Sequence, residues 1–509
     1  MVKMKSLLVP ALAALAACGE APPPAPATPS PTPPARVAQK PPAQRTAEAF
    51  RKSPPAPGPE VQFVPPKIQE ARLPNGVRVL LVERHELPIV AVEIVTDRGA
   101  DQGGPALGAF VGAMLTQGTK ARSSLEFSDA MGRIGAQFSS GVGHDGGGVS
   151  GQALAPRFGE LLALIGDAYM RPAFAKPEVE RERSRRLNLL AQMNDQPSAL
   201  LSIAIGRALY PEAHPYHAPL LGTEAALGRV APADLQRFHA AHYQPDHTTV
   251  AIAGDVRRDQ ALQEVERVFG GWKGKAKPAK APEPPPEAAA GARVVLVDRA
   301  GLTQSMVAVA LPGVARVTPD YEALLVMNTL LGGQFTSRLN LNLREKHAYT
   351  YGARSSFDMR HGPGPFTAGG AIVRENTGPA VKEILAEIRR MREELVTAEE
   401  LDDAKANLIQ RLPAQFETAG ATASTLAGLA IYGLPLDEYA TRPAKIRAVT
   451  REDVQRVAQK YLTQDRLKLV LVADAAKVQA QLEPLGLGAV DLQATPAATP
   501  AKAPAGKTP

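Results

Sequence analysis

The chain has a single cysteine, Cys18, among its 509 residues. An intramolecular disulfide needs two thiols and a cysteine-ligated zinc site needs more than one, so the mature protein has neither. The folded part must therefore depend on its apolar cores. Hydrophobic residues make up 44% of the sequence, enough for sizeable cores. At about 100 to 200 residues per domain, this length predicts two or three domains.

The sequence also lacks a long apolar run at its N-terminus. Lys3 and Lys5 precede a short apolar stretch, which is typical of a secretory signal and too short to span a bilayer as a helix. Leu15-Ala-Ala-Cys18 resembles the bacterial lipobox, in which the cysteine is lipid-modified and becomes the first mature residue. We expect residues 1–17 to be a signal peptide and Cys18 to be the lipidation site. Gly19 after the cysteine favours the outer membrane, facing the periplasm.

Aromatic residues and dense basic runs are scarce. The net charge is +7, from 58 Lys and Arg against 51 Asp and Glu, and aromatic residues make up 5% of the chain. Nucleic-acid binding proteins commonly gather basic and aromatic side chains on one surface. We therefore expect no nucleic-acid function.

Proline is abundant instead, and many of the 47 prolines lie in residues 22–66, residues 278–286 and the last fifteen residues. Segments of this composition cannot bury enough apolar surface to fold. They predict a tether over residues 18–66, a linker over 274–290 and a disordered tail over 493–509.

The remaining sequence is a repeat. Asn75-Gly76 is a turn signal before a β-branched run, Arg78–Arg84, that recurs as Arg293–Arg299. Two helical segments, at Pro177–Glu180 and Asp234–Arg237, also have counterparts about 220 residues later. Strands and helices alternate irregularly in both copies. We predict an α+β protein with two homologous domains, residues 67–273 and 291–492, each an antiparallel-type sheet packed with helices, forming a two-lobed clamp.

The helix expected around Ala109 has no ionisable side chain from Ala106 to Leu115, so it can only pack. Histidines elsewhere form local groups without a metal motif, so we interpret them as structural or surface residues: His239 with His242, His214 with His217, and His144 beside Asp145. The sequence predicts no metal site in this chain.

Several motifs in order resemble those of the insulinase/pitrilysin peptidase family, in its short two-domain form similar to the mitochondrial processing peptidase. The resemblance covers residues 67–492. It is carried by Leu73-Pro-Asn-Gly76, His214-Pro-Tyr216, Leu221-Gly-Thr223, Tyr243-Gln-Pro-Asp246, Ala253-Gly-Asp255, Leu331-Gly-Gly333, Ser337-Arg-Leu339 and Leu343-Arg-Glu-Lys346.

The resemblance implies an inverted zinc motif, His-x-x-Glu-His, on one helix, with a further Glu as the third protein ligand. In this sequence those positions are apolar: Ala109, Gly112, Ala113 and Leu189. The resemblance also implies an Arg and a Tyr that bind substrate and stabilise the developing oxyanion, and these match Arg344 and Tyr351. Tyr349 is an alternative for the tyrosine.

Loss of one half of the site and retention of the other suggest a divided enzyme. The leading hypothesis is a lipid-anchored, non-catalytic subunit that supplies Arg344 and Tyr351 in trans to a zinc-bearing paralogue, which cleaves unfolded peptides. A second hypothesis is a stand-alone peptide-binding or scaffold lipoprotein. A third is an autonomous peptidase with unusual metal ligands.

Overall fold

The computed structural model describes residues 62–104, 106–278 and 293–494. The signal peptide, Cys18, nearly all of the tether, most of the linker and nearly all of the tail lie outside the described residues. No helix in the described part of the chain combines the length and apolar character that crossing a membrane requires.

The first half contains a six-stranded sheet in the order β1-β2-β6-β3-β5-β4. Its strands are β1 (Gln69–Arg72), β2 (Arg78–Glu83), β3 (Ile89–Thr96), β4 (Gln137–Val142), β5 (Gly147–Leu154) and β6 (Thr248–Gly254). Its helices are α1 (Leu107–Met114), α2 (Ser124–Arg133), α3 (Phe158–Met170), α4 (Lys176–Asp195), α5 (Pro197–Leu209), α6 (Glu224–Arg229), α7 (Pro232–His242) and α8 (Arg258–Phe269). The turn expected between β1 and β2 forms at Asn75 and Gly76, where Gly76 has a φ of 103° that glycine adopts without strain.

The second half contains a six-stranded sheet in the order β12-β7-β11-β8-β10-β9. Its strands are β7 (Val294–Asp298), β8 (Gln304–Pro312), β9 (Thr350–Phe357), β10 (Pro365–Val373), β11 (Lys468–Ala473) and β12 (Val490–Ala494). Its helices are α9 (Tyr321–Asn328), α10 (Arg338–Asn340), α11 (Thr377–Glu393), α12 (Ala398–Gln410), α13 (Ala419–Ile431), α14 (Glu438–Ala448), α15 (Arg451–Tyr461) and α16 (Ala475–Leu482), with wide π-helical turns η5 (Thr329–Gly333) and η6 (Leu341–Lys346). Strand β12 ends at Ala494, two residues beyond the boundary expected at Leu492.

The two sheets share one plan, which confirms the predicted α+β class and its duplication. In the first sheet β6 lies between β2, to which it is parallel, and β3, to which it is antiparallel. In the second sheet β11 lies in the same way between β7 and β8. Antiparallel pairs are the majority in both sheets, and the parallel pairs make the sheets mixed.

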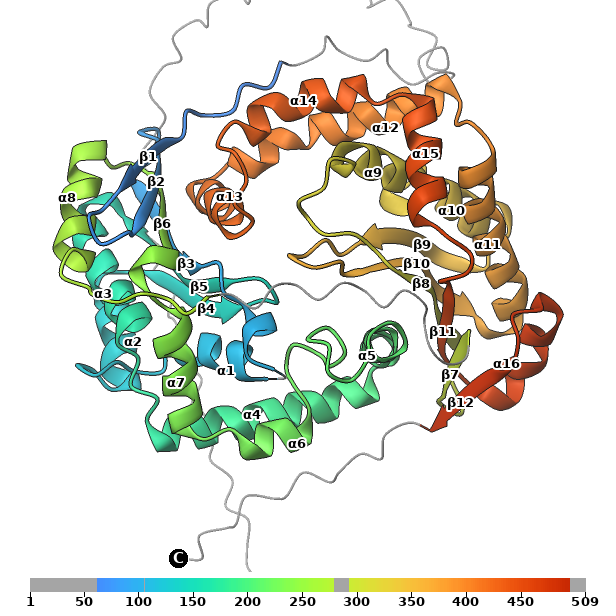
Figure 1. The fold of residues 1–509 in the computed structure, drawn as a ribbon, viewed down its shortest axis with the longest axis horizontal. Helices are drawn as coiled ribbons and strands as arrows, with labels where there is room; N and C mark the ends of the chain where they lie inside the picture. The colour runs from blue at the N-terminus through green and yellow to red at the C-terminus, as the bar shows by residue number, and fades with distance from the viewer. Residues whose placement is uncertain (1–61, 105, 279–292, 495–509) are drawn as a thin grey trace, which may run out of the picture. The chain divides into compact units, whose positions relative to one another are not determined.

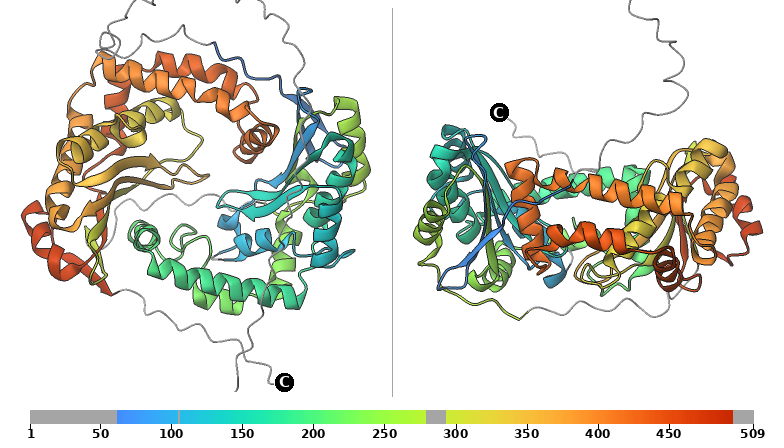
Figure 2. Two further views of the ribbon diagram at one scale, coloured as in Figure 1. Left: turned by 180° about the vertical axis from the view of Figure 1, so that it is seen from behind. Right: turned by 90° about the horizontal axis from the view of Figure 1, so that it is seen from above.

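Each half covers one face of the other half's sheet with a helix. Every residue of β6 and of β11 is buried, so both faces of these strands need apolar cover. Helix α13, from the second half, packs with β2, β3 and β6 (Figure 1). Helix α5, from the first half, packs with β7, β8 and β11 (Figure 2). The two halves are therefore joined by packing as well as by the covalent linker.

Candidate functional site

Helix α1 carries three of the positions where the resemblance implies zinc chemistry. Ala109 and Gly112 are buried and Ala113 is half-buried. A Cβ atom added at Gly112 would lie 2.6 Å from Cγ2 and 2.7 Å from the backbone nitrogen of Val142, at the end of β4. Real Cβ atoms do not approach backbone this closely, so no side chain fits at Gly112 without a shift of β4.

A buried ion pair on α4 lies against α1. Arg186 Nε donates to Glu182 Oε1 at 2.7 Å, and Arg186 Nη2 donates to the carbonyl oxygen of Ala109 at 2.6 Å. The Arg186 guanidinium also lies 4.9 Å from the ring centroid of Phe110. Its side chain is 5% exposed and that of Glu182 is 8% exposed. Burial lowers the pKa of Arg186, while Glu182 opposes that shift.

Leu189, where the resemblance implies the third protein ligand, is half-buried on the same helix, α4. Ala109, Gly112, Ala113 and Leu189 offer no side-chain atom that can ligate a metal ion. The structure thus brings a fixed protein cation, Arg186, to the contact between α1 and α4.

Arg344 lies in the π-helical turn η6 of the second half. Its side chain is 39% exposed, and its Nε lies 3.2 Å from Glu345 Oε1. The guanidinium also stacks over Phe335, 4.8 Å from the ring centroid. Phe335 is itself 60% exposed, so the pair forms a surface feature with a cation and an apolar face.

The two candidate tyrosines have different surroundings. Tyr351 is 88% exposed on β9, which packs against η6 and is an edge strand of its sheet. Tyr349 is half-buried and stacks on His347, with ring centroids 4.9 Å apart. Tyr349 also lines a separate cavity.

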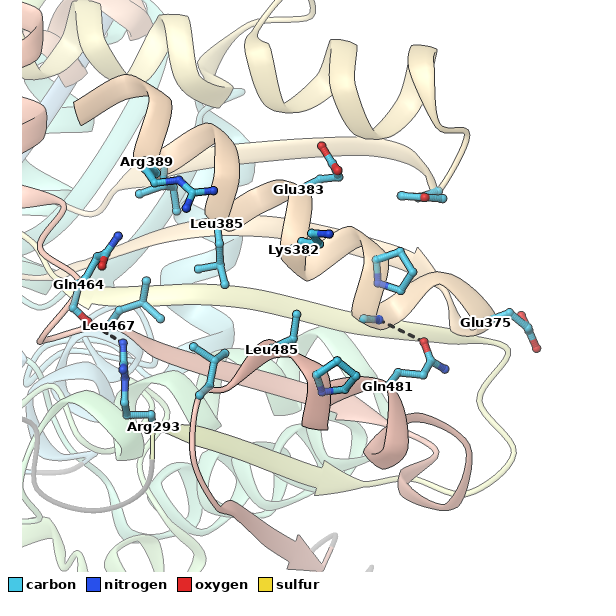
Figure 3. A pocket seen from close by; sticks show the side chains of 16 residues that line it. Arg293, Glu375, Lys382, Glu383, Leu385, Arg389, Gln464, Leu467, Gln481 and Leu485 are labelled. Carbon is cyan, nitrogen blue, oxygen red and sulfur yellow. Dashed lines mark hydrogen bonds between the residues drawn. The ribbon is translucent and has the colours of Figure 1, made fainter. Parts of the chain in front are cut away.

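That cavity, of about 920 Å³, lies in the second half beside α11 and α16. Figure 3 shows side chains of α11, including Lys382, Leu385 and Arg389, facing residues of the C-terminal segment. Arg293 and Gln464 close one end through a 2.8 Å hydrogen bond from Nη2 of Arg293 to the Gln464 carbonyl oxygen. Neither Arg344 nor Tyr351 lines it.

The histidine groups noted in the sequence make structural contacts. His239 is half-buried, its Nε2 bonds the carbonyl oxygen of Tyr169 at 2.7 Å, and desolvation lowers its pKa to about 4. His214 Nδ1 accepts a hydrogen bond from the Tyr216 backbone at 3.1 Å, and His217 Nδ1 bonds the Tyr210 carbonyl oxygen at 2.8 Å.

Sequence reasoning missed one group of metal-ligating side chains. Within the described residues, Asp101, Asp145 and His361 each offer a ligand atom, and these three atoms lie within 4.8 Å of one another. Asp145 and His361 are 216 positions apart in the chain, so no local motif could have united them.

Comparisons with known proteins agree with this architecture. Residues 229–408 match the family model described as the Peptidase M16 inactive domain. A crystal structure of a peptidase M16 inactive domain from Pseudomonas fluorescens superposes with a TM-score of 0.73 at 25% identity, covering 80% of this chain and 98% of that one. The chain has the fold of M16, or insulinase-type, peptidases, and residues 229–408 match that family's inactive domain.

Two of the similar curated proteins are matched over at least 90% of their own length. "Uncharacterized zinc protease YmxG" of Bacillus subtilis is 24% identical over 402 residues, 77% of this chain and 95% of that protein. "Uncharacterized zinc protease Mb2805c" of Mycobacterium bovis is 26% identical over 398 residues, 77% of this chain and 90% of its own length. The crystal structure of a protease from Helicobacter pylori has a similar fold, with a TM-score of 0.73 at 22% identity, covering 80% of this chain and 99% of that one.

Proposed function

We propose that this chain is a non-catalytic subunit of an M16-type zinc peptidase and that it contributes Arg344 and Tyr351 to peptide hydrolysis by a zinc-bearing paralogue. The observation that carries the proposal is an asymmetry between the two halves. The first half has apolar side chains at every position expected to serve the zinc, and the second half keeps an Arg and a Tyr at its surface.

The state of α1 supports the loss of zinc chemistry at this helix. A hydrolytic zinc site needs about three protein ligands and a base that activates water. Ala109, Ala113 and Leu189 supply no ligand, and Gly112 supplies no base. The contact of Gly112 with Val142 further shows that the first half has packed around the absence of a side chain at this position.

The surroundings of Tyr351 and Arg344 support a role toward an extended peptide. An edge strand has backbone N–H and C=O groups that can pair with an added strand. A peptide paired along β9 would lie beside the exposed Tyr351. A guanidinium and a phenol hydroxyl can both donate to a carbonyl oxygen that gains negative charge. Tyr351 fits this role better than Tyr349, whose ring stacks on His347 and lines the separate cavity.

The N-terminal sequence supports a proposed location in the cell envelope. Lipidation at Cys18 would anchor the chain, and the proline-rich tether would let the folded part act at a distance from the membrane. We propose the outer membrane, with the folded part facing the periplasm. Metabolic labelling with a fatty acid, compared between the wild type and Cys18→Ala, tests this placement.

Reconstitution tests the proposed function. The purified chain, a zinc-bearing paralogue from the same genome and their mixture are each assayed on unfolded peptides. The proposal predicts no cleavage by the chain alone and at least about a hundredfold faster cleavage by the mixture than by the paralogue alone, as expected for oxyanion donors. A paralogue that is equally active without this chain would contradict it.

The second candidate function is that of a stand-alone peptide-binding lipoprotein. The edge strand β9 could pair with a peptide, and α1 has no ionisable side chain for hydrolysis. The same purified chain distinguishes the two functions. Tight binding of an unfolded peptide, with no recovered partner and no effect on any paralogue's hydrolysis rate, would support the stand-alone role.

A further inference from the structure

Three loops from distant parts of the sequence meet at Asp101, Asp145 and His361. Asp101 lies in the short 3-10 turn Ala100–Gln102. Asp145 lies between β4 and β5, and His361 lies between β9 and β10. The group therefore joins the first half of the chain to the second half.

Hydrogen bonds hold two of these side chains in place. His361 Nε2 lies 2.9 Å from the carbonyl oxygen of Ile431. A carbonyl oxygen can only accept, so Nε2 carries a hydrogen, and in the neutral imidazole Nδ1 has its lone pair free to bind a metal ion. Asp145 accepts from the backbone nitrogen of His361 and from the hydroxyl of Tyr432, each at 2.9 Å. Outer hydrogen bonds of this kind commonly orient metal ligands in proteins.

The backbone fixes the third residue. Asp101 donates its backbone N–H to the carbonyl oxygen of His144 at 3.1 Å, and Ala100 donates to Gly143 at 3.0 Å. Gly99 permits this approach, because an added Cβ there would lie 2.0 Å from the His144 carbonyl oxygen.

With a neutral imidazole, none of the three side chains donates a hydrogen bond to another. Asp101 Oδ1 is buried and has no hydrogen-bond partner. His361 Nδ1 and Asp145 Oδ1 are 3.6 Å apart, which is too long for a hydrogen bond. Two ligands bound at about 2.1 Å to one tetrahedral ion lie about 3.4 Å apart, close to this spacing.

We propose that Asp101, Asp145 and His361 bind one divalent transition-metal ion, zinc or manganese, which links the β4–β5 loop to the β9–β10 loop. Two carboxylates and an imidazole suit such ions better than calcium or magnesium, which prefer all-oxygen sites. The ion stabilises the contact between the two halves. This proposal revises the sequence-based expectation of no metal in the chain, and it is independent of the proposed subunit function.

The test uses the untagged full-length chain, freed of metal with a chelator and then titrated with zinc or manganese chloride in a calorimeter. One ion should bind per chain, and the melting temperature should rise with metal concentration. Asp101→Asn and His361→Ala should each weaken binding about tenfold or more. Asp101→Asn preserves the side-chain shape, so it serves if His361→Ala fails to fold.

His85→Ala is the matched control. This exposed histidine also lies beside two carboxylates, Asp255 and Glu83, and its removal should leave the affinity unchanged. Absence of binding at millimolar metal, or binding that survives both Asp101→Asn and His361→Ala, would overturn the proposal.

Discussion

The guanidinium of Arg186 reaches across from α4 and donates to the carbonyl oxygen of Ala109 at 2.6 Å. Ala109 occupies the position where the family resemblance implies the first zinc-binding histidine. A protein cation paired with Glu182 thus stabilises the helix that carries no metal ligand. The apolar helix α1 and the buried ion pair on α4 are parts of one packed arrangement.

Replacement of Arg186 by Ala should lower the free energy of unfolding by about 3 kcal/mol or more, because it leaves the buried Glu182 without its buried partner. Arg185→Ala is the control, since Arg185 bonds the same carboxylate from a side chain that is 55% exposed. Its cost should stay near 1 kcal/mol or below. Denaturant unfolding measures both free energies. Equal losses of stability in the two variants would contradict the expected larger contribution of the buried Arg186.

Gly112→Ala should destabilise the protein by about 1–3 kcal/mol, because its Cβ would overlap Val142. Gly132→Ala in α2 is the matched control, since an added Cβ there has no neighbour within 4 Å. It should be neutral or stabilise by up to about 1 kcal/mol, as alanine favours helix. Thermal or denaturant unfolding decides between them. If Gly112→Ala is as stable as the wild type, the contact with Val142 does not exclude a side chain at this position.

The sequence allowed the duplicated α+β fold to be predicted because β2 and β7 carry nearly the same apolar strand and are followed by equivalent elements. It was not predictable that α5 covers the sheet of the second half and α13 the sheet of the first half, because an apolar helix face does not reveal which sheet it covers. The buried Arg186 was hidden in a helix rich in charged residues, where side chains are usually solvated. Asp101, Asp145 and His361 come together only through tertiary contact.

Acidification should destabilise the protein through His239. Burial depresses its folded-state pKa to about 4, below the value of about 6.5 in the unfolded chain. Its contribution is therefore fully present above pH 6.5 and is lost as the pH falls toward 4, by about 2 kcal/mol between pH 7 and pH 5.

His239→Gln should flatten the pH dependence of the unfolding free energy by that amount. His85→Ala should leave this acid loss in place, because Asp255 raises the pKa of His85 and the sign of its contribution is opposite. An unchanged pH profile in His239→Gln would contradict the assignment. Unfolding curves at pH 7, 6 and 5 supply the comparison.

Tyr351→Phe should leave the stability of the isolated chain within about 0.5 kcal/mol of the wild type, because the side chain is 88% exposed. In the reconstituted pair it should lower the rate of peptide cleavage by about a hundredfold, through loss of one donor to the oxyanion. Tyr349→Phe should have little effect on cleavage. The opposite ranking of the two variants would assign the role to Tyr349.

The most direct test of the divided site is the effect of Arg344→Ala on the kcat of the reconstituted pair. Lys346→Ala, which removes an exposed cation from the same turn η6, is the control. We predict that Arg344→Ala lowers kcat by about a hundredfold or more while the two chains still associate, and that Lys346→Ala leaves kcat unchanged. An unchanged kcat in Arg344→Ala, with intact association, would contradict the account.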